Sequence, residues 1–105
     1  MHRFICLVFQ WRSLSVIPLN TSIQAVACRV STFQPITLCS VYLPPSCSWK
    51  HTELLTLVSQ LPPPILLMGD FNAHNSLWGC TDTNGKGLEV ANFLLQSNLC
   101  LLNKT

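Results

Sequence analysis

The stretch that decides the fold is Pro62-Pro63-Pro64-Ile65-Leu66-Leu67-Met68-Gly69-Asp70-Phe71-Asn72-Ala73-His74. Its short apolar run is bounded by prolines, which predicts a fully buried strand. Asp70, Asn72 and His74 follow this run at alternate positions. An ionised group is costly to bury without partners, so a carboxylate held at a rigid strand end suggests a site for a metal, a water or a phosphate. The alternative is that Gly69-Asp70 merely begins a turn.

Strand and helix patterns alternate on both sides of this stretch. Two β-rich runs, 23–30 and 36–43, are joined by a short turn, which predicts an antiparallel pair. Apolar residues at helical spacing predict a helix over 49–61 that ends at the prolines. Strands, helical crossovers and one antiparallel pair predict an α/β (α+β) fold, with a mixed sheet covered by helices on one side.

The C-terminal third is predicted to contain a loop, a helix and a last strand. The loop runs over 71–86, with turn residues at Asp82-Thr83-Asn84-Gly85. The helix covers about 87–97, and its apolar spacing predicts that Leu88, Ala91, Leu94 and Leu95 face inward. The apolar run 99–103 completes the sheet as a short strand.

Composition limits the classes of protein. A chain of 105 residues forms one small domain or part of a larger one. It is 49% hydrophobic and 10% charged, which is the composition of an interior rather than of a free-standing small domain. The net charge of +2 is too small to indicate a nucleic-acid-binding surface by itself.

The six cysteines show neither Cys-x-x-Cys pairs nor zinc-finger spacing. Cys28, Cys39 and Cys100 lie in apolar runs, which predicts buried free thiols, although a disulfide framework of a secreted protein is the alternative. The apolar run near the N-terminus is too short for a signal peptide, and no run approaches the length of a membrane span. We therefore expect a protein that is neither secreted nor membrane-bound.

Several segments carry a family resemblance. The string Ile-Leu-Leu-Met-Gly-Asp-Phe-Asn-Ala-His, 65–74, resembles the Gly-Asp-Phe-Asn segment of the endonuclease/exonuclease/phosphatase superfamily. Upstream, 36–45 resembles the preceding core strand, which ends in Tyr-x-Pro-Pro. Segments 17–27, Asn75-Ser76-Leu77-Trp78-Gly79 and 98–103 are similar to the endonuclease domain of jockey-type non-LTR retrotransposons. The resemblance covers most of the chain.

The resemblance implies a fold and a set of site residues. The fold is a four-layer α/β sandwich, of which this chain offers part. Asp70 would orient or deprotonate the attacking water, Asn72 would hold the scissile phosphate, and the phenol of Tyr42 would donate to a phosphate oxygen. Asp70 is also the candidate for indirect contact with Mg²⁺ or Mn²⁺. His74 and Trp78 are candidates for the rim of the substrate groove, with a structural loop histidine and a buried loop anchor as the alternatives.

The resemblance also implies missing parts. The family's metal-binding glutamate would precede Met1, and its Ser-Asp-His motif would follow Thr105. We therefore expect 17–105 to be the central part of an endonuclease domain truncated at both ends, with 1–16 left unassigned. Such a fragment would be inactive alone. In the complete element it would act on DNA, in the nucleus, ahead of a reverse transcriptase domain.

Two other readings stay open. The first is a superfamily phosphatase or deadenylase, because Gly-Asp-x-Asn does not separate these substrates. The second is a small secreted or binding protein without enzymatic activity, which native disulfides would favour.

Overall fold

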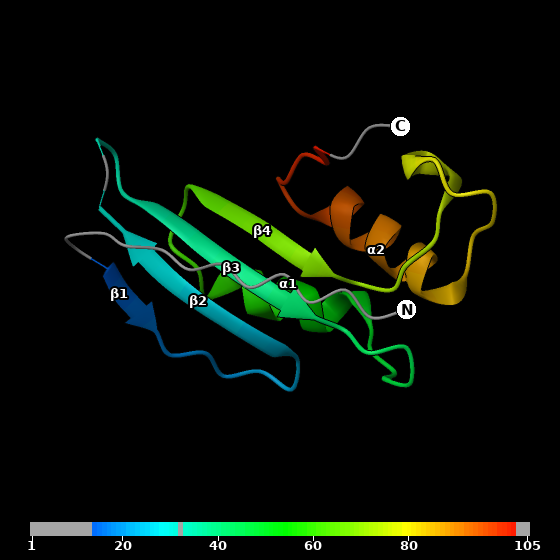
Figure 1. The fold of residues 1–105 in the computed structure, drawn as a ribbon, viewed down its shortest axis with the longest axis horizontal. Coiled ribbons are helices and arrows are strands. Elements are labelled where there is room, and N and C mark those ends of the chain that lie inside the picture. Colours follow the sequence, from blue (N-terminus) through cyan, green and yellow to red (C-terminus); the bar gives the residue numbers. More distant parts are fainter. Residues whose placement is uncertain (1–13, 32, 103–105) are drawn as a thin grey trace.

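Four strands and two α-helices make up the computed structural model, which describes residues 14–31 and 33–102 (Figure 1). The strands are β1 (Leu14–Ile17), β2 (Gln24–Val30), β3 (Ile36–Tyr42) and β4 (Ile65–Asp70). The helices are α1 (His51–Ser59) and α2 (Gly85–Gln96), with a 3₁₀ turn, η1 (Ser76–Trp78), between β4 and α2. The strands form a sheet in the order β1-β2-β3-β4.

The sheet is mixed, as the sequence predicted. β1, β2 and β3 pair antiparallel, and β4 adds to β3 in parallel after the α1 crossover. β1 is an additional strand that the sequence did not predict; its residue Leu14 pairs with Val30 and its residue Ile17 with Ala27. Residues 1–13 of the unassigned N-terminal segment lie outside the described residues.

The hydrophobic core lies between one face of the sheet and the two helices. Leu54 and Leu57 of α1 are fully buried, and Phe93 of α2 is 2% exposed. They form one cluster with Cys39 and Val41 of β3. In Figure 1, α1 lies behind the sheet, α2 lies beside β4, and the loop with η1 extends past the end of β4. The predicted α/β (α+β) class with helices packed on one sheet face is confirmed.

The inward face of α2 differs in part from the prediction: Leu94 packs against the core and Ala91 is half-buried, but the other two residues are not. Leu88 and Leu95 are 57% and 83% exposed, whereas Val90 and Phe93 are buried. The rotation of the helix is set by Gly87, which lies against the carbonyl oxygen of His74: a Cβ at Gly87 would come within 1.7 Å of that oxygen. The face that contains Gly87 must therefore point inward. Val90 and Phe93, three and six residues later, lie on the same face and are buried with it.

The prediction that β4 is fully buried was wrong. Leu66 is 38% exposed, and β3 is the sole hydrogen-bonded neighbour of β4 among the described strands. The expected last strand is also not observed, because residues 99–102 are irregular and Leu102 is 73% exposed; Asn103 lies outside the described residues. The outer edge of β4 is thus unpaired by any strand within 14–31 and 33–102.

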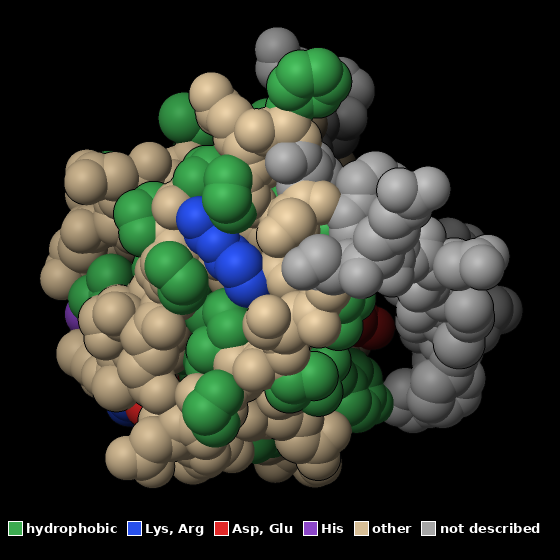
Figure 2. All heavy atoms as spheres, turned by 90° about the vertical axis from the view of Figure 1, so that its left-hand side faces the viewer, with side chains coloured by type: hydrophobic (Ala, Val, Ile, Leu, Met, Phe, Trp, Pro, Cys, Tyr) green, Lys and Arg blue, Asp and Glu red, His purple; other side chains and the backbone are tan. Residues whose placement is uncertain are grey.

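The surface carries little charge. Figure 2 views the molecule from the left-hand side of Figure 1 and shows hydrophobic side chains scattered over polar surface, with few basic or acidic groups. The cysteines are only partly buried: Cys39 is buried, but Cys28 is half-buried and Cys100 is exposed, which corrects the expectation for these two. In the part of the chain that the structure describes, no helix has the length and apolar character needed to cross a membrane.

Candidate functional site

The candidate site lies where β3 and β4 end. These strands run in parallel, so their carboxyl ends meet at one edge of the sheet. Tyr42 and Asp70 are direct register partners there and therefore share one face. The backbone N–H of Leu43 donates to the carbonyl oxygen of Asp70 at 2.9 Å, which continues the pairing one step past the strand end. The sheet thus places the predicted phenol and carboxylate beside each other.

Asn72 ties the two strand ends together. Its backbone N–H donates to Oδ1 of Asp70 at 3.0 Å, and its side-chain Nδ2 donates to the carbonyl oxygen of Leu43 at 2.8 Å. Its φ of 49° is in the left-handed region, which asparagine tolerates better than most residues. Neither Oδ1 of Asn72 nor Oδ2 of Asp70 has a hydrogen-bond partner among the described residues. Each of the two side chains is therefore anchored through one atom and keeps an acceptor oxygen for a ligand.

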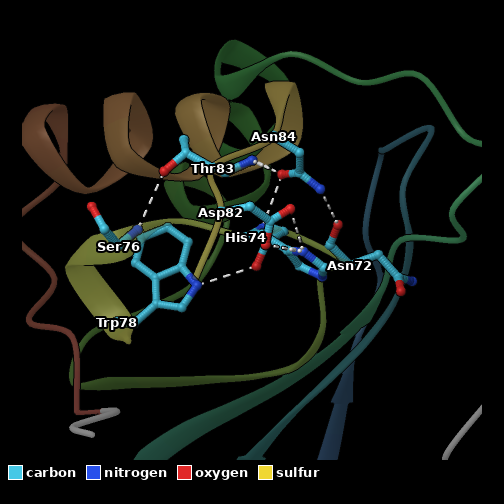
Figure 3. Close-up of polar contacts among 9 residues, drawn as sticks. Asn72, His74, Ser76, Trp78, Asp82, Thr83 and Asn84 are labelled. Carbon is cyan, nitrogen blue, oxygen red and sulfur yellow. Dashed lines mark hydrogen bonds and ion pairs between the residues drawn. The ribbon is translucent and has the colours of Figure 1, made fainter. Parts of the chain in front are cut away.

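His74 is held by a carboxylate. Its Nδ1 lies 3.2 Å from Oδ1 of Asp82, and both side chains are more than half exposed. An exposed pair of this kind adds little stability. The indole Nε1 of Trp78 donates to the carbonyl oxygen of Ala73 at 3.1 Å (Figure 3). In this structure Trp78 anchors the loop that carries the candidate residues.

Asn84 and Lys86 contact the loops at the candidate site, and the sequence analysis did not single out either residue. Asn84 caps α2 and also bonds to the loop after β4, and Figure 3 shows it facing Asn72 and His74. Nζ of Lys86 donates to the carbonyl oxygens of Pro44, at 3.1 Å, and of Pro45. The first turn of α2 therefore holds the loops that follow both β3 and β4. Asparagine just before a helical pattern is a recognised capping signal, but its second role depends on tertiary contacts.

A half-open hollow of about 1340 Å³ runs along β4 and α2. Asp70, Asn72, His74 and Trp78 line it together with apolar side chains of β4, α1 and α2, whereas Tyr42 does not. Asp70 and His74 are the lining residues that carry a carboxylate and an imidazole, and Cys80 and Cys100 add two thiols. The carboxylate and the imidazole that line the hollow thus lie at the end of β4 and in the loop that follows it.

The oxygen donors fit one side of a magnesium or manganese site. Mg²⁺ is bound through one or two carboxylates and keeps several waters or phosphate oxygens. Asp70 supplies the carboxylate oxygen Oδ2 and Asn72 the amide oxygen Oδ1, and neither atom has a hydrogen-bond partner among the described residues. No group of three or more His, Cys, Asp or Glu side chains gathers within 14–31 and 33–102. The two described oxygen atoms would therefore fit an ion whose remaining ligands are water molecules and phosphate oxygens.

The shifted pKa values lie away from this edge. Burial raises the pKa of the Cys39 thiol to about 11, so this core cysteine is not a nucleophile. The backbone N–H of His51 lowers the pKa of Glu89, whose carboxylate joins the start of α1 to α2. The two groups with shifted pKa values, Cys39 and Glu89, thus lie in the core and between the helices rather than beside Asp70.

Comparison with known proteins gives two matches. A family model described as endonuclease-reverse transcriptase matches residues 36–105. A Drosophila melanogaster protein named "Probable RNA-directed DNA polymerase from transposon X-element" is 32% identical over 65 residues, which is 62% of this chain. The matched part spans 7% of that relative's length. No solved structure matches the chain.

Proposed function

The chain belongs to the endonuclease-reverse transcriptase family, and from this membership we propose that it supplies part of an endonuclease site that hydrolyses phosphodiester bonds of DNA. The predicted resemblance of the chain to the endonuclease domain of non-LTR retrotransposons is confirmed by the family match and by the transposon relative. The observation that carries the proposal is the pairing of Asp70 with Tyr42 at the sheet edge, with Asn72 bonded across it.

The proposed roles follow from the chemistry of the three side chains at the sheet edge. Asp70 has a carboxylate oxygen that can accept a proton from, or orient, an attacking water. Asn72 commits one Nδ2 hydrogen to Leu43, so its second Nδ2 hydrogen is available to hold a phosphate oxygen. Tyr42 stands beside Asp70 in the register, and its phenol can donate to a second phosphate oxygen. His74 and Trp78 lie farther along the loop, where they would bound the substrate.

A divalent ion fits this proposal. Asp70 and Asn72 would supply oxygen ligands to Mg²⁺ or Mn²⁺, and the remaining ligands would be water and phosphate. When bound, the ion would withdraw negative charge from the phosphate. Because Asp70 is the carboxylate at this edge among the described residues, we expect the 105-residue chain by itself to bind the ion weakly and to be inactive.

The relative's name suggests the partners. It is named as an RNA-directed DNA polymerase from a transposon, so we propose that this domain acts beside a reverse transcriptase region and nicks target DNA in the nucleus.

The test is nicking of supercoiled plasmid, with and without Mg²⁺, by the protein encoded by the whole reading frame that contains this sequence. Asp70→Asn should lower the rate by about two orders of magnitude or more, because an amide cannot accept the proton. Glu53→Gln, the same carboxyl-to-amide change on α1, is the matched control and should leave the rate unchanged. His74→Ala should cost far less than Asp70→Asn. Nicking that survives Asp70→Asn would refute the proposed site.

A further inference from the structure

We infer that Asn84 is a positioning residue: it fixes the conformation of Asn72 and so sets the geometry of the candidate site from the first turn of α2. The inference rests on the proposed function for its consequence in catalysis. Its structural part stands on contacts within the chain.

Asn84 uses both ends of its amide. Oδ1 accepts from the backbone N–H of Gly87 at 2.7 Å, which is the ordinary capping bond at the start of a helix. The same oxygen accepts from the backbone N–H of His74 at 2.9 Å. Nδ2 donates to the carbonyl oxygen of Asn72 at 3.3 Å. The backbone N–H of Asn84 also donates to the carbonyl oxygen of His74 at 2.9 Å, so the loop and the helix start are joined on both sides (Figure 3).

Asn72 needs this support because of its backbone. A φ of 49° is unfavourable for a residue with a Cβ, and such a conformation persists when surrounding contacts over-determine it. Asp70 holds its N–H, Leu43 holds its Nδ2, and Asn84 holds its carbonyl oxygen. Of these three contacts, those from Asp70 and Leu43 lie at the sheet edge, whereas the contact from Asn84 comes from the start of α2. It therefore links the orientation of Asn72 to the docking of α2.

Close packing at Gly87 keeps the helix start at bonding distance. The missing Cβ lets the backbone of α2 approach His74, and Gly87 is buried although it has no side chain. Asn75 reinforces the contact, because its Nδ2 donates to the carbonyl oxygen of Gly87 at 3.3 Å. The first turn of α2 is thus in direct van der Waals and hydrogen-bond contact with the loop after β4.

The chemistry explains why an asparagine stands at position 84. Aspartate and serine cap helices as well as asparagine does. A carboxylate could accept from His74 and Gly87, but it could not donate to the Asn72 carbonyl oxygen and would repel it. Asparagine both accepts and donates, so one side chain can cap α2 and at the same time bind the carbonyl oxygen of Asn72.

The experiment separates these two roles with Asn84→Asp and Asn84→Ala, and with Asn98→Asp as a control for added charge on an exposed asparagine. Thermal unfolding and the NMR resonances of the Asn72 side-chain amide are measured on the 105-residue chain. Asn84→Asp should keep the unfolding temperature within a few degrees but shift the Asn72 resonances. Asn84→Ala should lower the unfolding temperature as well, and Asn98→Asp should change neither.

Nicking by the whole reading-frame protein supplies the catalytic readout. Asn84→Asp should lower kcat by about ten- to a hundredfold with KM nearly unchanged, because small misplacements of reacting groups cost this much. Unchanged Asn72 resonances in Asn84→Asp would overturn the inference, and so would a shift accompanied by wild-type kcat. If the resonances shift as expected but the unaltered protein nicks no DNA, the positioning role stands and the proposed function fails.

Discussion

Two glycines in the first turn of α2 should respond in opposite ways to the same substitution. A Cβ at Gly85 would meet nothing within 4 Å, whereas a Cβ at Gly87 would lie 1.7 Å from the carbonyl oxygen of His74 and 2.5 Å from its carbonyl carbon. The atoms met at Gly87 belong to the backbone, so they cannot rotate away. Gly87→Ala therefore forces α2 away from the loop, and Gly85→Ala does not.

The magnitudes follow from these contacts. Alanine is favoured over glycine in a helix interior by about 0.5–1 kcal/mol, which is the upper bound of the gain at Gly85, the first residue of α2. At Gly87 the same gain is outweighed by overpacking, which costs about 1–3 kcal/mol. Separation of the helix from the loop also weakens the capping bond from Asn84, which is worth about 0.5–2 kcal/mol. We expect Gly87→Ala to destabilise the fold by about 2–3 kcal/mol net.

Thermal unfolding followed by circular dichroism measures both variants. For a domain of this size 1 kcal/mol corresponds to about 4–8 °C, so Gly87→Ala should lower Tm by about 10–20 °C and Gly85→Ala should raise it by a few degrees. Equal shifts for the two variants would refute the packing of α2 on the loop. A rise in Tm for Gly87→Ala would mean that the loop after β4 does not approach the helix as described.

Three further predictions concern other parts of the fold. Arg29→Lys should lower the free energy of unfolding by about 1–3 kcal/mol in urea titrations, because Nη1 and Nη2 donate to the carbonyl oxygens of Pro62 and Pro63 and an ammonium group cannot reproduce this fork. Glu89 has a pKa below its usual 4.5, so its ionised form stabilises the fold above that pH and the contribution is lost as the pH falls through the lowered value; Glu89→Gln should flatten the acid side of a stability-against-pH curve, and an unchanged acid side would contradict this. Iodoacetamide at pH 8 should alkylate the exposed Cys100 quickly and the buried Cys39 only on unfolding, as mass spectrometry of timed digests can show.

The sequence predicted those features that depend on local patterns. Alternation and short turns were enough for β2 and β3, and helical spacing ended by prolines was enough for α1. The neighbouring ends of β3 and β4 followed from parallel pairing, which brings Tyr42 to Asp70. These features could be predicted without knowing which side chains contact one another in the folded chain.

The features that were missed depend on tertiary contacts. Apolar residues recur around α2, so spacing alone did not distinguish the face of Leu88 from that of Phe93; the close approach at Gly87 decides it. The apolar run of β4 predicted burial, but full burial requires cover on both faces of the sheet, and the described helices pack on one of them. The second role of Asn84 is not visible in sequence, because its partners lie 10 and 12 residues away.

The order of strands along the sheet has a consequence for how the chain folds. Each strand pairs with its immediate predecessor, so the sheet can grow by short loop closures and one crossover, which favours rapid folding. The loop after β4 is different, because it is held by a helix that follows it in sequence. We therefore expect the edge that carries the candidate site to become ordered last and to open first. Native-state hydrogen exchange should find the amides of β2 and β3 among the slowest to exchange, and the amide of His74 among the fastest of those that are hydrogen-bonded.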